Sequence, residues 1–269
     1  MTDAPIVEID DLRFSYGPRA VLRGVSLRIP RGKISAILGS SGSGKTTLLQ
    51  LVGGALRPAA GHVRVFGQDM QQLDRAGLYA MRRRLGMMFQ RGGLFSDLTV
   101  FDNLAFPMRE HTDLPEPVIR HLVLMKLHAV GLRGAQRLMP AELSGGMARR
   151  VALARAIALD PELIIYDEPF AGLDPITLNV IANLIRTLND TLAATSVIVT
   201  YDVQEALSIA DHLFLLNDGL IVADAPTREM VESSDPFVHQ FLHAEPDGPV
   251  RFHYPASRAL AADLEASPL

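Results

Sequence analysis

The sequence contains no cysteine and no tryptophan, and only 6% of its 269 residues are aromatic. Without cysteine, disulfide bonds and thiolate metal sites are excluded, which is compatible with a reducing cytosol. The eight histidines are scattered without the spacing of zinc ligands. A formal net charge of −4 gives no basic excess, so no nucleic-acid partner is expected.

Long apolar segments are also missing. No run approaches the ~18 residues that a membrane-spanning helix needs, and residues 1–5 lack the basic and apolar regions of a secretion signal. Hydrophobic residues nevertheless make up 48% of the chain, which is ample for a substantial core. If the protein works at a membrane, we therefore expect another chain to span it.

One stretch matches the phosphate-binding P-loop pattern, in which two glycines at fixed spacing precede Lys and then Ser or Thr: Gly39, Ser40, Ser41, Gly42, Ser43, Gly44, Lys45, Thr46 and Thr47. The apolar run 34–38 before it predicts a buried parallel strand, and the helical spacing of apolar residues 48–52 predicts a helix whose N-terminus faces phosphate. We expect Lys45 to reach the β- and γ-phosphates of ATP and the Thr46 hydroxyl to bind Mg²⁺. A flexible linker, the other interpretation, would not require Lys and Thr at these positions.

A second apolar strand, residues 163–166, ends in Asp167 and Glu168. Carboxylates are costly to bury unpaired, so a core strand that ends in two acids needs a cation or hydrogen-bond donors. Beside a P-loop, we expect Asp167 to hold Mg²⁺ through its waters and Glu168 to orient the water that attacks the γ-phosphate. Two solvated acids at the start of a loop are the alternative.

The rest of the pattern predicts an α/β fold. Strands are expected within 6–29 and at 61–67, 85–90 and 195–200, followed by a hairpin around Asn217-Asp218-Gly219. The strand at 85–90 ends on Gln90, at the sheet edge where ligands of open α/β sheets gather. No strand pattern interrupts residues 92–143, and a further helix is expected over 148–159.

We therefore expect a nucleotide-binding core and two helical additions. The core comprises residues 1–91 and 148–228, a helical subdomain is inserted over 92–147, and 229–269 form one short helix and a tail. Within the core, Tyr16 either stacks on a base or packs on its neighbours at a strand end. Arg82-Arg83-Arg84 is either a solvated helix end or a site for phosphate or a lipid headgroup.

The segment Leu143-Ser144-Gly145-Gly146 just before the acidic strand narrows the class. Together with the P-loop and the strand-end acids, it resembles the ATP-binding subunits of ABC transporters over roughly residues 6–225. The resemblance implies a RecA-like core, an N-terminal antiparallel β-subdomain and the inserted helical subdomain. It also implies two ATP molecules held between two copies of the chain.

The same resemblance assigns further roles to individual residues. Ser144, Gly145 and Gly146 would contact the γ-phosphate of ATP held by the partner subunit, since a helix N-terminus offers free N–H groups to an anion. Tyr16 would stack on adenine. Gln90 would contact Mg²⁺ and the attacking water, and Asp174 would lie in the loop that crosses the dimer interface.

Several stretches are similar to the ATPases of Mla-type phospholipid transporters: 92–97, 106–112, 132–135, 143–150 and 247–255. Met147, where most ABC ATPases have Gln, agrees with that pattern. The resemblance implies a homodimer on the cytoplasmic face of the bacterial inner membrane, bound to an inner-membrane permease whose coupling helix docks on part of the segment 91–107. A periplasmic MCE lipid-binding subunit and a small STAS-domain regulator complete the implied complex. It would move phospholipid between the inner and outer membranes and maintain outer-membrane lipid asymmetry.

One position departs from the family. Most ABC ATPases carry a His after the last core strand that contacts the γ-phosphate, and here that position is Tyr201. A tyrosine hydroxyl donates one hydrogen bond, but its pKa of ~10 prevents a change of protonation near neutrality. Our hypothesis is that Glu168 remains the principal catalytic residue and that Tyr201 only positions phosphate or the dimer interface, with slower turnover.

Two further interpretations stay open. The aromatic tail Phe252-His253-Tyr254-Pro255 either packs on the second copy or the regulator, as the Mla resemblance suggests, or ends the chain as a disordered surface segment. The cargo is either phospholipid or another molecule such as an organic solvent. A soluble ABC ATPase acting on DNA or ribosomes is a third class, but the long insertions or second ATPase unit typical of those proteins are missing.

Overall fold

The computed structural model describes residues 4–90 and 92–249, and the chain divides into two compact units, Met1–Thr227 and Arg228–Leu269. The first unit begins with an antiparallel sheet of order β2-β1-β4-β5, whose strands are β1 (Val7–Tyr16), β2 (Arg19–Ile29), β4 (Ala60–Val65) and β5 (Gln68–Asp69). The strands expected within 6–29 are therefore present, and the one expected over 61–67 is β4.

The larger sheet has six strands in the order β10-β9-β3-β8-β7-β6: β3 (Ile34–Leu38), β6 (Leu85–Met88), β7 (Leu163–Asp167), β8 (Thr195–Thr200), β9 (His212–Asn217) and β10 (Leu220–Pro226). All neighbours pair in parallel except β9 and β10, which form the expected hairpin. Every residue of β3, β7 and β8 is buried. Their continuous apolar runs are typical of strands covered on both faces.

The register of this sheet brings three strand ends together. Leu38 at the end of β3 pairs with Thr200 of β8, and Asp167 at the end of β7 pairs with Val199. Because parallel strands point the same way, the loops that follow β3, β7 and β8 all leave from one edge. The P-loop, the two acids and Tyr201 follow these strands directly.

Helix α1 (Lys45–Val52) starts at this edge and helps to join the two sheets. Its Leu48, Leu49, Leu51 and Val52 belong to an apolar cluster that also contains buried residues of β1, β2 and β4 and of the larger sheet. Burial of such side chains contributes roughly 1.5–3 kcal/mol each. The P-loop is therefore held by packing on both sides.

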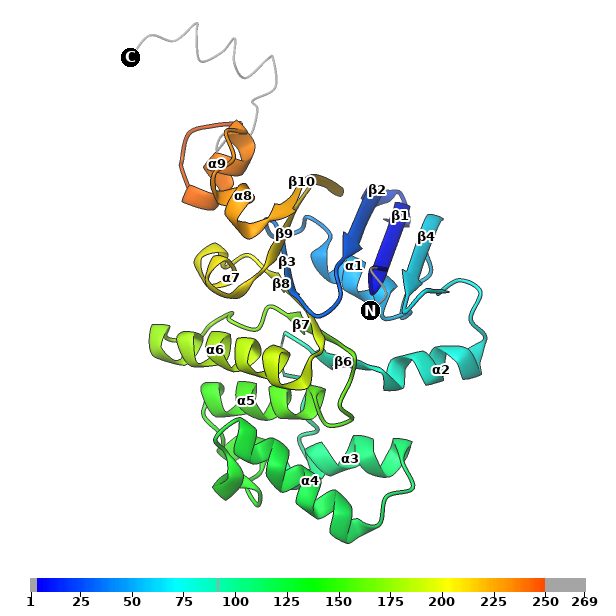
Figure 1. Ribbon diagram of the computed structural model, residues 1–269, viewed down its shortest axis with the longest axis vertical. Coiled ribbons are helices and arrows are strands. Elements are labelled where there is room, and N and C mark those ends of the chain that lie inside the picture. Colours follow the sequence, from blue (N-terminus) through cyan, green and yellow to red (C-terminus); the bar gives the residue numbers. More distant parts are fainter. Residues whose placement is uncertain (1–3, 91, 250–269) are drawn as a thin grey trace, which may run out of the picture. The chain divides into compact units, whose positions relative to one another are not determined.

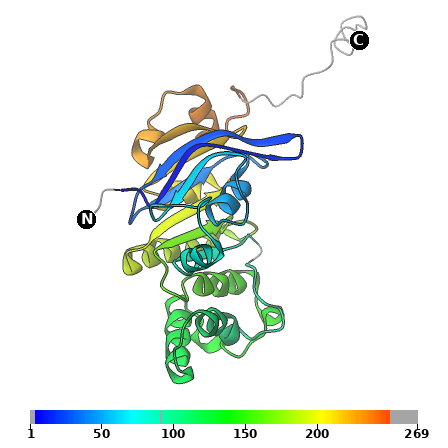
Figure 2. The same cartoon turned by 90° about the vertical axis from the view of Figure 1, so that its right-hand side faces the viewer.

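A helical segment separates β6 from β7. It contains α3 (Val100–His111), α4 (Glu116–Ala129) and α5 (Gly145–Ala156), with short 3₁₀ turns at Arg133–Ala135 and Pro140–Glu142. These three helices pack on one another, and both views place α3 and α4 beyond α5, away from the antiparallel sheet (Figures 1 and 2). Helix α5 starts at Gly145 rather than at 148, because the Ser144 hydroxyl caps it by accepting from the Met147 amide at 3.3 Å.

The remaining helices of this unit are α2 (Arg75–Arg83), α6 (Pro175–Leu192) and α7 (Val203–Ile209). After β10 the chain forms two helices, α8 (Thr227–Val231) and α9 (Pro236–His243). The sequence-based expectation of a single helix after Thr227 is therefore wrong, since five residues are too few to display helical periodicity. The aromatic tail predicted to pack on a partner lies outside the described residues.

Among residues 4–90 and 92–249, no helix combines the length and hydropathy needed to cross a bilayer.

The described C-terminal helix α9 is capped by Asp235, whose Oδ1 accepts from the amides of Phe237 and Val238 at 2.8 and 3.0 Å. The subdomain boundaries at 92 and 147 remain predictions, since residues 1–227 form one unit.

Candidate nucleotide-binding site

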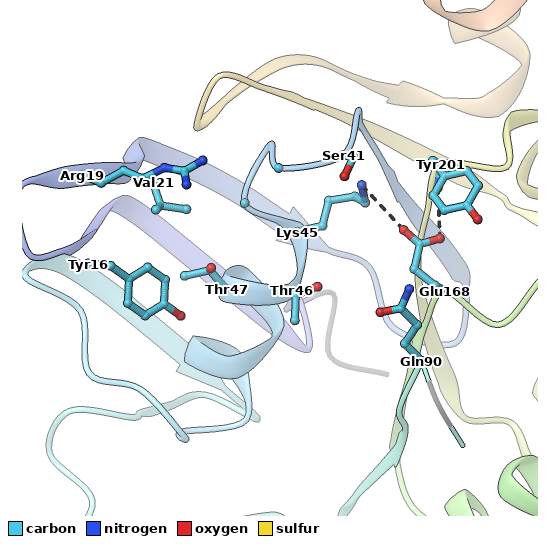
Figure 3. Close-up of a pocket in the computed structure, with 12 residues that line it drawn as sticks. Tyr16, Arg19, Val21, Ser41, Lys45, Thr46, Thr47, Gln90, Glu168 and Tyr201 are labelled. Atoms are coloured by element: carbon cyan, nitrogen blue, oxygen red, sulfur yellow. Dashed lines mark hydrogen bonds and ion pairs between the residues drawn. The ribbon is translucent and has the colours of Figure 1, made fainter. Parts of the chain in front are cut away.

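The P-loop opens into a cavity of about 530 Å³, drawn in Figure 3. Its lining comes from the strand ends, the P-loop and the β1–β2 hairpin: Tyr16, Arg19, Val21, Ser41, Gly42, Gly44, Lys45, Thr46, Thr47, Gln90, Glu168 and Tyr201. Tyr16, Arg19 and Val21 lie on one side of the P-loop, while Lys45, Gln90, Glu168 and Tyr201 converge on the other. Most of the residues expected to bind nucleotide are thus brought together.

Glycines are required by the P-loop conformation. Gly44 has φ 108° and caps α1, and an added Cβ would lie 2.8 Å from Leu22 Cδ2. At Gly39 an added Cβ would come within 2.3 Å of the Leu216 carbonyl oxygen. The loop therefore turns tightly against β2 and β9, in a conformation that side chains would not permit.

Lys45 points its ammonium group into the loop. Its Nζ donates to the carbonyl oxygens of Gly39 and Ser40 at 2.7 and 3.0 Å and lies 3.7 Å from Glu168 Oε1. Burial lowers the pKa of Lys45, and Glu168 opposes that shift. The cation is thus held at the cavity by backbone oxygens, which a phosphate group could replace as partners.

Glu168 adopts a left-handed backbone conformation, with φ 47°, that non-glycine residues rarely adopt. Its amide donates to the Val199 carbonyl at 2.8 Å, and its Oε2 accepts from the Tyr201 amide at 3.2 Å. Burial raises the pKa of Glu168, and Lys45 opposes that shift. Backbone strain at such a place is common at functional sites. Here this backbone conformation directs the Glu168 carboxylate, whose raised pKa makes it a stronger base, toward the cavity.

Asp167 is buried, and its Oδ1 has no hydrogen-bond partner among the described residues. Burial raises its pKa, and Lys45 lowers it. Thr46 and Asp167 together line a smaller cavity next to the first. An unpartnered buried carboxylate oxygen and a threonine that line the same cavity offer oxygen ligands of the kind that Mg²⁺ prefers. In the described part of the chain no cluster of three His, Cys, Asp or Glu residues could bind a metal by itself.

Gln90 is exposed at the rim of the main cavity, two residues beyond the end of β6. The strand is shorter than the predicted 85–90, so Gln90 lies on the following loop. On the other side of the cavity, the ring of Tyr16 packs edge-on against Phe14 at 4.9 Å and its hydroxyl donates to Gln50 at 3.3 Å. Since Tyr16 is also 50% exposed and lines the cavity, both interpretations of this residue remain open.

Arg19 and Val21 line the cavity but were not expected from the sequence. Arg19 is exposed and has no ion pair among residues 4–90 and 92–249. The sequence feature that could have indicated Arg19 is its position three residues after Tyr16, in the hairpin that leads back to the P-loop. Sequence alone does not reveal that this hairpin folds over the loop.

Ser144, Gly145, Gly146 and Asp174 do not line the cavity of their own chain. Ser144 caps α5, and Gly146 lies against Thr177, where an added Cβ would be 2.6 Å from Cγ2. The Asp174 carboxylate caps α6, accepting from the amides of Ile176 and Thr177, both at 3.0 Å. The N-termini of α5 and α6 are therefore neighbours, and they meet away from the P-loop.

Helix α2 ends at Arg83, as the helix-end interpretation of the arginine run predicts. Two of the three arginines nevertheless make contacts within the protein. Arg82 donates to the carbonyls of Gly53 and Gly54, both at 3.1 Å, and Arg84 pairs with Glu162 at 2.6 Å.

The fold and the cavity define a class: a P-loop nucleotide-binding domain with a helical segment between two strands of its sheet. A family model described as "ABC transporter" matches residues 22–171. A dimeric post-hydrolysis structure of the ATP-binding cassette MJ0796, bound to ADP and Pi, superposes with a TM-score of 0.76 at 30% identity, over 82% of this chain and 99% of that one. The chain therefore belongs to the ABC transporter family, whose ATP-binding members are ATPases.

Two relatives with higher sequence identity indicate a narrower group within this family. The intermembrane phospholipid transport system ATP-binding protein MlaF of Haemophilus influenzae is 55% identical over 93% of this chain and 95% of its own length. The protein of the same name from Escherichia coli K12 is 53% identical over 94% of both chains.

Proposed function

We propose that this chain hydrolyses ATP as a homodimer and thereby powers phospholipid transport through a membrane partner. The observation that carries the ATPase assignment is the placement of Lys45 and Glu168 3.7 Å apart in a P-loop cavity, next to the unpartnered Asp167 carboxylate. A core that served stability alone would exclude these charged groups, because burying even an ion pair costs free energy. Their retention at one sheet edge fits a site for phosphate and a cation.

Most polar residues of the cavity have a role in this proposal. The P-loop amides and Lys45 bind the phosphates, and Glu168 accepts a proton from the attacking water while the Tyr201 amide holds its carboxylate. Thr46, Asp167 and Gln90 would hold Mg²⁺, which when bound neutralises phosphate charge. Tyr16 would stack on adenine, and the hydroxyl of Tyr201 positions phosphate or the dimer interface.

The second copy completes the site. Ser144 and Gly145 are exposed, and the space where a Cβ of Gly145 would lie is open. Ile176, two residues after Asp174, is a large apolar side chain that is 79% exposed. These features support a surface, built by the N-termini of α5 and α6, that contacts a partner subunit and its ATP. The dimeric relative supports the same arrangement.

The phospholipid assignment rests on the two relatives named for intermembrane phospholipid transport. We infer the same cargo for this chain, at the cytoplasmic face of an inner membrane. A permease would dock on part of the segment 91–107, and an MCE protein and a STAS-domain regulator would join the complex. The exposed Phe95 and Phe106, whose rings lie 4.9 Å apart, offer apolar contact area in that segment.

The test is co-expression with the proposed permease partner, purification in detergent and reconstitution into vesicles. We expect Mg²⁺-dependent ATP hydrolysis and ATP-dependent transfer of a fluorescent phospholipid to acceptor vesicles. The Lys45→Ala variant should assemble normally and lose both activities. Hydrolysis without lipid transfer would refute the cargo alone, whereas absence of ATP binding in the wild type would refute the ATPase assignment.

A further inference from the structure

Arg149 on α5 binds the loops that follow two neighbouring strands. Its Nη1 donates to the carbonyl oxygen of Gln90, after β6, and its Nη2 donates to the carbonyl oxygen of Ala171, after β7, at 3.0 Å. Strands β6 and β7 pair in parallel. We propose that Arg149 is a positioning residue that ties these two loops, and with them Gln90 and Glu168, to helix α5, which Ser144 caps. This inference rests on the proposed ATPase function.

The environment of the Arg149 guanidinium group favours its position between these two carbonyl oxygens. Arg149 is half-buried, and no carboxylate forms an ion pair with it in the described part of the chain. Burial lowers its pKa, whereas Tyr201 and Glu168 raise it. A partly desolvated cation needs hydrogen-bond acceptors, and the two carbonyl oxygens supply them. Moving either loop away would therefore leave the cation short of a partner.

The contact with Ala171 leads directly to Glu168. The Ala171 amide donates back to the Glu168 carbonyl at 3.4 Å, so one short turn contains both the acid and the carbonyl that Arg149 binds. On the other side, Gln90 itself supplies the carbonyl. Arg149 thus donates hydrogen bonds to the backbone of Gln90, which lines the nucleotide cavity, and to the turn that begins at Glu168, which also lines it.

Packing does not make this link redundant. A cavity of about 410 Å³ lies between the loop after β6 and the first turns of α5, and Gln90, Gly145 and Arg149 are among its lining residues. Farther along α5, Arg155 donates to the Gly93 carbonyl at 2.7 Å, but it reaches only the loop after β6. Among the described side chains of α5, Arg149 is the one that joins both loops.

The geometry also explains why arginine is needed. The planar guanidinium presents separate N–H groups to two acceptors at fixed angles, whereas a lysine ammonium is a compact charge on a flexible stem. A glutamine at this position has one amide group and no charge. Misplacing a catalytic group by about 1 Å can cost on the order of 100-fold in rate.

The test compares R149Q and R149K with R150Q in the full transporter complex. Arg150 is the matched control, since it is the next residue of α5 and donates to a single carbonyl, that of Val130, in the helical segment. We expect R149Q to lower kcat by about 10- to 100-fold while KM and the Kd of a fluorescent ATP analogue change less than about twofold. R149K should recover part of kcat, and R150Q should retain it.

Hydrogen exchange supplies a readout that does not depend on hydrolysis. We expect amides in peptides covering Gln90 and Glu168–Ala171 to exchange faster in R149Q than in R150Q, with similar melting temperatures. Unchanged exchange, or equal losses of kcat and stability in R149Q and R150Q, would overturn the proposal. If R149Q does not fold, R149K decides, with faster exchange at both loops supporting the proposal and wild-type exchange refuting it. A wild type without ATPase activity would refute the proposed function instead.

Discussion

The P-loop edge of the sheet and the start of the helical segment use the same kinds of side chain in opposite ways. At the edge, Asp167 has a buried oxygen without a partner and Glu168 is held in a strained backbone conformation. Burial raises the pKa of both carboxyls. In the folded chain alone, these acids are costly to keep ionised.

Around Arg109 on α3 the acids are stabilised, one on the same helix and one at the start of α4. Arg109 pairs with Asp102 at 3.0 Å and with Glu116 at 2.6 Å. The pKa of Asp102 is lowered, first by the hydroxyl of Thr99 and then by Arg109. Nearby, the buried Asn103 amide donates to three backbone carbonyls at 3.0–3.1 Å and accepts from the Phe95 amide at 2.8 Å.

This difference between the two regions indicates where a ligand is expected to gain binding energy. Polar groups in α3 find their partners within the chain and contribute to stability. At the P-loop edge, Asp167 Oδ1 has no partner and Lys45 is held by carbonyl oxygens and Glu168, so a ligand that supplies or replaces these partners gains affinity. Mutations should therefore separate function from stability, with opposite outcomes in the two regions.

The largest effect is expected for Glu168→Gln. Loss of the proton acceptor should lower kcat by about 10²- to 10⁴-fold, while the side-chain oxygen still accepts from the Tyr201 amide. ATP affinity should persist, and the melting temperature should change little, because the removed charge is costly to bury but also pairs with Lys45. Steady-state ATPase assays and nucleotide titration check this, and near-normal hydrolysis would remove Glu168 from its proposed role.

Asp167→Asn should come next. If Asp167 holds Mg²⁺, the variant should require at least ~10-fold more Mg²⁺ for half-maximal activity, since an amide oxygen carries no charge to bind the ion. Stability should be unchanged or higher, because the buried Oδ1 has no partner to lose. Asp113→Asn, at an exposed position between α3 and α4, is the control. An unaltered Mg²⁺ requirement in Asp167→Asn would contradict the assignment.

Asn103→Ala should lower stability and leave the nucleotide site unchanged, which is the reverse of the pattern expected for the Glu168 and Asp167 variants. The substitution removes all four hydrogen bonds of a fully buried side chain, including the one accepted from the Phe95 amide, and should lower the free energy of unfolding by about 3 kcal/mol. The Kd for ATP should stay within about twofold, because Asn103 does not line the cavity. Chemical denaturation measures the first quantity, with the exposed Glu110→Ala on the same helix as control. A strong loss of ATP affinity without destabilisation would break the comparison.

The smallest effect is expected for Tyr201→Phe. The contact seen with Glu168 comes from the backbone amide, which the variant keeps, and the side chain is 48% exposed. A single exposed hydrogen bond is worth about 1 kcal/mol or less, so kcat should fall by about two- to fivefold. Wild-type rate and ATP affinity would show that the hydroxyl positions nothing.

Much of this organisation was predictable. The continuous apolar runs of β3, β7 and β8 predicted buried parallel strands, and the residue types that follow them predicted the P-loop and the strand-end acids. The short helix α8 was missed, since five residues give little periodic signal. The strand before Gln90 was predicted too long because Phe89 extends the apolar run without joining the sheet.

Contacts between distant segments could not be predicted. The cavity positions of Arg19 and Val21 depend on how the β1–β2 hairpin packs over the P-loop. The double contact of Arg149 depends on loops that are 59 and 22 residues away in the sequence. One sequence shows the period of each element but not these pairings.

The most direct test of the account is sedimentation of the Glu168→Gln variant with saturating Mg-ATP, with Mg-ADP and without nucleotide. Two copies that complete each other's site should form a dimer with Mg-ATP alone, and adding Ser144→Arg at the N-terminus of α5 should return that dimer to monomer. A variant that binds Mg-ATP but stays monomeric, or a dimer that is indifferent to both nucleotide and Ser144→Arg, would contradict the account.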